Sequence, residues 1–312
     1  MYRFFGDRLF IESVRRIGAT HSFGKVRFFV MKYIQFLPHS ARWLRFVDAY
    51  HRRHTGETAP LEMIRTKFMR TYYSRKLSPA RRLRQLRDHF ELAEIYLRDD
   101  ILARLLKGDH LRLCHLRGKD GETFTCTVGR HDRYRAEGEL TLFMHQDGYA
   151  PALAAVTFAF GRDALGRMVV RIGGLQGPQS EDSRERIVHA TRALHGLRPK
   201  AAVVHGLYAM TEPFAPVAVE AVGKVNHPLD NDRHAFFADN DGFWQELGGQ
   251  PNPHGDLVLP VPLPERKAED VLAKKRKNWL ARRAVRQALR AGTLETVEAW
   301  LRYPDPTALA AG

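Results

Sequence analysis

The spacing of apolar residues changes about a third of the way along the chain, where a helical pattern gives way to short alternating runs. The clearest helical pattern covers residues 78–106, in which apolar side chains recur at intervals of three and four. Ser78 is a favourable N-cap, Pro79 suits the first helical position, and Gly108 is a typical stop signal. We therefore predict that residues 1–108 are mostly α-helical.

Beyond this block, apolar and polar residues alternate in short runs separated by turns rich in glycine and aspartate. The runs predict strands over 111–115, 123–128, 139–145, 153–160 and 167–172. The later pattern predicts a helix over 183–195, strands over 200–208 and 217–222, and a helix over 267–291. A hairpin meander before the first of these helices favours an α+β fold, with a helical basic N-terminal part and a mixed, mainly antiparallel sheet with helices.

Charge is distributed unevenly over the 312 residues, whose net charge is +15. Counting Lys and Arg against Asp and Glu, residues 1–108 carry +13, residues 109–264 carry −3 and residues 265–312 carry +5. These shifts predict a basic helical region, an α/β sandwich domain and a basic C-terminal helical segment. The excess of positive charge favours an acidic or polyanionic partner.

The chain shows no pattern typical of a membrane span. Its most apolar N-terminal stretch, residues 26–37, is interrupted by Arg27 and Lys32 and is shorter than the roughly 20 residues that a span requires. The first ten residues lack the apolar run of a signal peptide, so we expect a cytoplasmic protein. A basic, aromatic helix over 25–47 leaves two interpretations open: packing on the neighbouring domain, or peripheral contact with the inner membrane.

The cysteine and histidine content excludes some classes of chemistry. Only two cysteines are present, Cys114 and Cys126, which excludes a disulfide scaffold and a cysteine-rich zinc site. The spacing of His145 and the other histidines and acids matches no zinc-binding pattern. No serine lies in the Gly-x-Ser-x-Gly motif that carries the nucleophile of many hydrolases. The sequence therefore predicts no metal site.

The most specific local motif is the glycine-rich run at residues 172–178, which we predict to be a turn from a strand into a helix. Backbone N–H groups in such a turn, together with a helix N-terminus, suit a phosphate or pyrophosphate. The residues that would form this site are Gly173, Gly174, Gln176, Gly177, Ser180 and Ser183. The alternative is a tight turn or a close backbone approach that needs glycine for steric reasons.

Further polar and aromatic residues follow the motif. His205 lies within a predicted apolar strand, and Glu212 lies at a predicted strand end, from which a general base reaches substrate. A packed core histidine is the alternative for His205. Near the turn-rich segment after residue 225, we expect a substrate pocket formed by His227, Asp241, Phe243 and Trp244, unless the two aromatic rings only anchor a loop.

The predicted C-terminal helix is densely basic and includes the run Lys274-Lys275-Arg276-Lys277. Such a cluster suits an acidic partner, including nucleic acid. Aromatic residues within it are limited to Trp279, and no nucleic-acid motif accompanies it, so nucleic-acid binding is the second alternative function.

Several segments together resemble the VirK/YbjX family of bacterial proteins. They are residues 77–83, 138–142, 172–177, 191–200, 243–249 and 274–276, within a likeness that covers about residues 70–290. The segments Ile172–Gly177 (IGGLQG) and His195–Lys200 (HGLRPK) are the most specific. The resemblance implies a link to virulence, envelope integrity and antimicrobial-peptide resistance in Gram-negative bacteria, and it implies no defined reaction or catalytic residues.

The predicted order of elements is also similar to the Gcn5-related N-acyltransferase fold, although the Arg/Gln-x-x-Gly-x-Gly/Ala pattern of that superfamily is not reproduced. This likeness implies acyl transfer to an amine, with acyl-CoA or an acyl-phosphopantetheine held at the glycine-rich run. His205 or Glu212 would deprotonate the amine and Tyr208 would protonate the leaving thiolate. The basic flanks would attract an acidic acyl carrier protein or an anionic membrane surface. A non-catalytic protein that binds a membrane or a partner is the first alternative.

Overall fold

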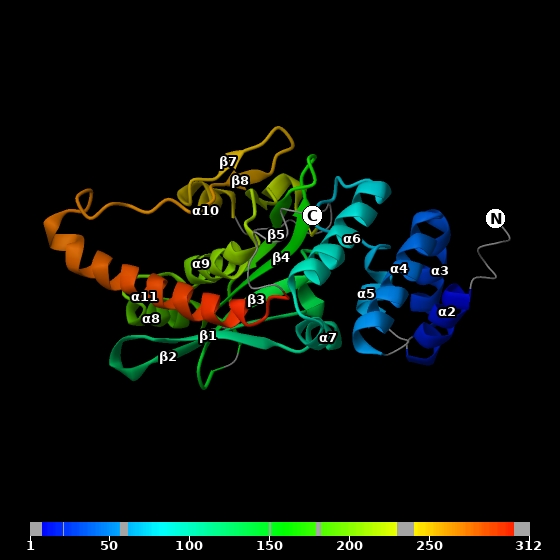
Figure 1. The fold of residues 1–312 in the computed structure, drawn as a ribbon, viewed down its shortest axis with the longest axis horizontal. Coiled ribbons are helices and arrows are strands. Elements are labelled where there is room, and N and C mark those ends of the chain that lie inside the picture. Colours follow the sequence, from blue (N-terminus) through cyan, green and yellow to red (C-terminus); the bar gives the residue numbers. More distant parts are fainter. Residues whose placement is uncertain are drawn as a thin grey trace.

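The computed structural model describes residues 8–20, 22–56, 62–149, 151–178, 182–229 and 240–302, and it has an α+β fold (Figure 1). The N-terminal helices are α2 (Arg8–Thr20), α3 (Phe23–Gln35), α4 (His39–Thr55), α5 (Glu62–Lys67), α6 (Pro79–Tyr96) and α7 (Asp99–Lys107). The later helices are α8 (Ser183–Ala193), α9 (Pro199–Thr211), α10 (Asp241–Glu246) and α11 (Ala273–Glu298). None of the described helices is long and apolar enough to cross a membrane.

Eight strands form one mixed sheet in the order β1-β2-β3-β4-β5-β6-β8-β7. They are β1 (Leu111–Arg117), β2 (Thr123–Gly129), β3 (Leu140–Gln146), β4 (Ala154–Arg162), β5 (Met168–Gln176), β6 (Ala218–Ala221), β7 (Gln250–Pro251) and β8 (Leu257–Leu259). Strands β1 to β5 are an antiparallel meander, as predicted, and β5 and β6 are the parallel pair. The mixed, mainly antiparallel sheet predicted from the sequence is therefore confirmed.

The segment 200–208 corrects the prediction of a strand, because it lies within helix α9. Pro199 occupies the first helical position and Arg198 before it is extended, which together start a helix. Helix α9 and helix α11 pack against the sheet, and Gly206 of α9 lies beside Leu142 and Leu289. A helix buried on most sides is apolar all round, so its sequence lacks helical periodicity and is easily mistaken for a strand.

The predicted helix over 78–106 is two helices, α6 and α7, separated by an extended Leu97. Ser78 caps α6 by accepting a hydrogen bond from the Arg81 N–H, and Gly108 ends α7 in the left-handed conformation, as predicted. The break occurs because Leu97 forms a β-bridge with Leu301, while the adjacent Arg98 N–H donates to Trp300 O at 2.9 Å. Contacts from residues far along the chain thus override the local helical pattern.

The other predicted elements lie close to their expected positions. Helix α8 falls within predicted residues 183–195, strand β6 within 217–222, and α11 covers most of 267–291 and extends to Glu298. The basic aromatic stretch 25–47 is divided between α3 and α4 rather than forming one helix, because the chain turns at Phe36–Pro38.

A buried ionic cluster joins the N-terminal helices to the sheet. Glu139 Oε1 lies 2.8 Å from Lys67 Nζ, and its Oε2 lies 2.9 Å from Arg130 Nη1. All three side chains are almost inaccessible to solvent. Burial acts to raise the pKa of Glu139, but the charges of Lys67 and Arg130 outweigh burial and hold it below its usual value. Glu139 is therefore ionised inside the protein.

Candidate functional site

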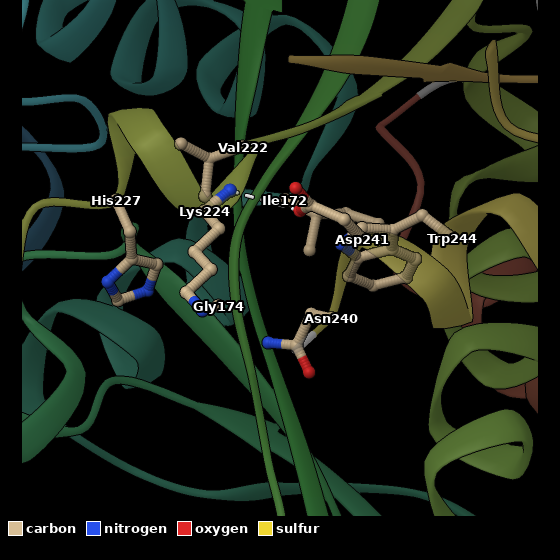
Figure 2. Close-up of a pocket in the computed structure, with 8 residues that line it drawn as sticks. All are labelled: Ile172, Gly174, Val222, Lys224, His227, Asn240, Asp241 and Trp244. Carbon is tan, nitrogen blue, oxygen red and sulfur yellow. Dashed lines mark hydrogen bonds between the residues drawn. The ribbon is translucent and has the colours of Figure 1, made fainter. Parts of the chain in front are cut away.

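A small polar pocket lies at the carboxyl ends of the parallel pair (Figure 2). Strand β6 ends one residue before Val222, while β5 continues past its last pairing with β6, at Ile172, as far as Gln176. The lining residues are Ile172, Gly174, Val222, Lys224, His227, Asn240, Asp241 and Trp244. Its volume of about 10 Å³ is close to the space that one water molecule needs. Carboxyl ends of parallel strands are a common place for ligand sites.

The wall opposite β5 is a short turn that hydrogen bonds hold in place. Asp256 accepts from the Gly223 N–H at 3.0 Å and from the Asn226 side chain at 2.8 Å. Asp241 accepts from the Lys224 N–H at 3.0 Å. Figure 2 shows the Lys224 side chain crossing the pocket, with His227 on one side and Asn240 on the other.

Glu137 is the buried carboxyl group behind this pocket. Its Oε1 accepts a hydrogen bond from Gln176 Nε2 at 3.0 Å and lies 3.8 Å from His227 Nε2. Its Oε2 is buried and has no hydrogen-bond partner among the described residues. The carboxyl also lies directly against Gly174, so Glu137 contacts β5 and the turn at once.

Burial raises the pKa of Glu137 to about 8, although the hydrogen bond from Gln176 and the charge of Arg133 act in the opposite direction. The carboxyl is therefore mostly protonated at pH 7 and becomes ionised just above it. A carboxyl whose pKa lies near the working pH is suited to general acid–base catalysis, and such shifts are concentrated at functional sites.

The glycine-rich run is not a turn between a strand and a helix, because Gly173 and Gly174 lie inside β5. At Gly173 the register with β4 shifts by one residue, which is a β-bulge. A Cβ on Gly173 would lie 1.7 Å from Glu137 O, and a Cβ on Gly174 would lie 1.8 Å from Glu137 Oε2. The two glycines are thus required by the close approach of Glu137, the steric alternative that the sequence left open.

Replacing Gly173 with alanine is expected to destabilise the protein by about 1–3 kcal/mol or more, because the new methyl group meets a backbone carbonyl. Chemical denaturation at pH 7 measures this loss. Gly177→Ala is the matched control, since its Cβ would meet only Lys200 Cε at 3.9 Å. Equal stability of the Gly173 and Gly177 variants would show that Glu137 can move away from β5.

A larger hollow of about 300 Å³ includes Tyr134, whose carbonyl accepts a hydrogen bond from the Glu137 N–H at 2.8 Å, and Gly177, which follows β5. It is lined by His110, His131, Arg133, Tyr134, Phe143, His145, Pro151, Ala152, Ala154, Ala155, Gly177 and Pro178. Burial raises the pKa of Tyr134, Arg133 opposes this rise and Glu137 adds to it, so Glu137 is within electrostatic reach of the hollow. Within the described part of the chain, no group of three or more His, Cys, Asp or Glu residues is arranged to hold a metal ion.

The structure brings together a good part of the predicted site. Gly174, His227, Asp241 and Trp244 line the pocket, and Gln176 binds Glu137 behind it. Gly177 lines the larger hollow, and the Ser183 hydroxyl donates to Pro178 O at the start of α8. The predicted phosphate contact at Ser180 lies outside the described residues.

The predicted acid–base residues lie elsewhere. Glu212 follows α9 rather than a strand, and both its oxygens accept hydrogen bonds from Arg290. His205 lies on α9 and lines a hollow beside α11, and burial, aided by Arg286, lowers its pKa to about 4. The Tyr208 hydroxyl donates to Pro260 O at 3.0 Å, and Phe243 packs edge-on against Trp244. None of these four is among the residues that line the pocket.

Sequence reasoning missed Glu137, Lys224 and Asn240. A signal for Glu137 was available, because Glu137-Gly138-Glu139 places two carboxylates immediately before an apolar strand. Two adjacent glycines within a predicted strand are a second signal, since they indicate that another group approaches the backbone closely. Lys224 and Asn240 have no comparable signal, because only the fold brings them to β5.

The fold and site define a mixed α+β protein with a buried carboxyl group at the carboxyl ends of a parallel strand pair. The family model described as "Protein of unknown function (DUF535)" matches residues 20–293, and the chain belongs to this family. It is 28% identical over 218 residues to "Uncharacterized protein YbjX" of Escherichia coli (strain K12), covering 68% of this chain and 66%, just under two thirds, of that relative. It is 24% identical over 296 residues to an "Uncharacterized protein" of Haemophilus influenzae, covering 90% of each chain. The VirK/YbjX assignment made from the residues is thereby confirmed.

Proposed function

We propose that the protein transfers an acyl group from a phosphopantetheine thioester, carried by coenzyme A or an acyl carrier protein, to an amine. The observation that carries this proposal is the buried Glu137, whose pKa of about 8 makes it a general base poised close to neutral pH. Glu137 takes the role that the sequence suggested for His205 or Glu212, because it contacts Gly174 and lies 3.8 Å from His227, two residues that line the pocket.

The chemical step needs a base, and Glu137 supplies one. The amine nitrogen attacks the thioester carbonyl, a C–N bond forms and the C–S bond breaks. The ionised form of Glu137 accepts the proton that the amine loses, and the leaving thiolate takes a proton from water. Gln176 and His227 hold the Glu137 carboxyl in place from β5 and from the turn.

The space near Glu137 that can hold a substrate is the larger hollow, since the pocket at β5 has a volume of only about 10 Å³. The hollow of about 300 Å³ suits a flexible acyl or amine substrate, with Gly177 and Pro178 at its edge. Gly177 and the start of α8 at Ser183 are where the phosphates of the donor would lie in an arrangement similar to Gcn5-related N-acyltransferases. Basic segments on both sides of the sheet would attract an acidic carrier protein and raise its rate of association.

The test is transfer from a panel of acyl-CoA and acyl carrier protein thioesters to a panel of amines, followed by mass spectrometry of the products. We expect Glu137→Gln to lower the rate by about 10²–10⁴-fold while leaving donor affinity within a few-fold of wild type. The rate of the wild type is expected to rise with pH around an apparent pKa near 8.

Glu212→Gln is the matched control, since it makes the same change in a carboxylate paired with Arg290 outside the pocket, and its rate is expected to stay within about twofold. Absence of both donor binding and transfer for every thioester would overturn the proposal. Transfer that survives Glu137→Gln would remove Glu137 from the mechanism.

A further inference from the structure

Helix α3 exposes an apolar face at one end of the molecule. Phe23, Met31 and Ile34 have exposed fractions of 82%, 57% and 40%. At about 100° per residue these three side chains fall within roughly 80° of one another around the helix. Phe29 and Tyr33 point to the opposite side and are fully buried in the N-terminal core. Core packing therefore explains only one side of this helix.

Basic residues are common on and around this helix. Residues 8–56 contain ten Lys and Arg but only two Asp and Glu. Lys25 and Arg27 are exposed on α3 itself, and Arg70 stacks over the Phe28 ring at 5.1 Å. An open hollow of about 230 Å³ lies beside them, with Ile17, Phe28 and Met69 in its lining and Lys25 and Arg70 among its polar residues.

We propose that the exposed face of α3 is a docking surface for an anionic lipid bilayer. Helices that lie in the plane of a membrane interface combine apolar side chains with flanking Lys and Arg residues. The basic residues match the negative charge of the lipid headgroups, and Phe23, Met31 and Ile34 enter the boundary with the acyl chains. The open hollow gives space for part of a lipid beside the helix.

The same observations favour a bilayer over nucleic acid or an acidic protein. Nucleic acid is bound mainly through contacts of Lys and Arg with its phosphates. Such binding does not require the large exposed apolar side chains that α3 presents. The other basic end of the molecule, the first half of α11, lies at the opposite end of the long axis from α2 and α3 (Figure 1). Leu272, just before α11, and Leu280 are exposed there at 63% and 50%, but Trp279, the aromatic residue of α11, is buried, whereas α3 exposes Phe23. This end therefore provides an internal comparison.

The experiment is co-sedimentation of the full chain with vesicles of 30% phosphatidylglycerol and 70% phosphatidylcholine, compared with pure phosphatidylcholine. We expect binding to the anionic vesicles that weakens as salt increases. Reversal of both charges in Lys25→Glu/Arg27→Glu should lower the partition coefficient by at least about 25-fold, since each basic residue near the surface contributes about fivefold. Phe23→Ser/Met31→Ser should lower it by about tenfold or more.

Lys274→Glu/Lys277→Glu and Leu272→Ser/Leu280→Ser are the matched controls at the start of α11, with the same changes in charge and polarity at the other end of the protein. They are expected to bind within about threefold of wild type, and circular dichroism should show that all variants are folded. The proposal is overturned if wild type does not bind the anionic vesicles, or if the α11 variants lose as much binding as the α3 variants. An intact acyl transfer activity in the α3 variants separates this surface from the proposed catalytic site.

Discussion

Replacing Glu139 with glutamine is expected to lower the free energy of unfolding at pH 7 by about 3–5 kcal/mol. The carboxylate lies 2.8 Å from Lys67 Nζ and 2.9 Å from Arg130 Nη1, with all three groups buried. Glutamine keeps the shape of the side chain but removes its charge, so two cations remain in the interior without a counter-ion. Because the cluster joins α5 to the sheet, its loss should weaken the attachment of the N-terminal helices to the rest of the protein.

Urea denaturation followed by circular dichroism measures this loss. Asp100→Asn is the matched control, since Asp100 pairs with Arg98 at 3.0 Å on the surface and should contribute less than about 1 kcal/mol. If Glu139→Gln costs no more than this control, water must reach the cluster and the interior there is not dry.

Glutamine in place of Glu137, two residues earlier in the chain, is expected to stabilise the protein at high pH, whereas Glu139→Gln destabilises it. Glu137→Gln should become more stable relative to wild type as the pH rises, because the Glu137 carboxyl is buried and burial disfavours its ionised form. Its pKa is about 8 in the folded protein and 4.5 in the unfolded chain. Between these values the folded state holds a proton that the unfolded state has lost, so wild-type stability falls as the pH rises through this range.

The expected size of this effect is on the order of 4 kcal/mol between pH 5 and pH 9. Urea denaturation of wild type and Glu137→Gln at pH 5, 7 and 9 measures it. The two proteins should be closest in stability at pH 5, should diverge steadily between pH 5 and pH 8, and should show no further divergence well above pH 8. Parallel pH profiles would mean that Glu137 is ionised in the folded protein and would also remove the basis for its role as a base near neutral pH.

The sequence predicts the fold wherever local patterns decide it. The meander, the cap at Ser78 and the stop at Gly108 follow from alternation and from backbone preferences within a few residues. Helix α9 and the break at Leu97 do not, because tertiary burial and contacts with residues around 300 determine them. Single-sequence patterns carry no information about such distant contacts.

The site is only partly predictable from the sequence, because contacts between residues far apart in the chain also form it. The glycines of the Ile172–Gly177 segment (IGGLQG), with Gln176, were identified as a special feature, yet the group that makes them necessary is Glu137, some forty residues earlier in the chain. The sequence patterns indicate a general base among residues that follow the motif in the chain, at His205 or Glu212. The structure instead places the buried Glu137, from the loop before β3, against β5, and Glu137 is the base that we propose.

The bridge between Leu97 and Leu301 also affects how the protein is made. Arg98 and Arg302 add hydrogen bonds to the same junction, from Arg98 N–H to Trp300 O and from Arg302 N–H to Tyr96 O at 2.8 Å. These contacts join residues separated by about two hundred positions. At the usual rate of synthesis, about 5–20 residues per second, residues 300–302 are made roughly 10–40 seconds after α6 and α7. During that interval the backbone at Tyr96–Arg98 lacks the hydrogen bonds that residues 300–302 later provide.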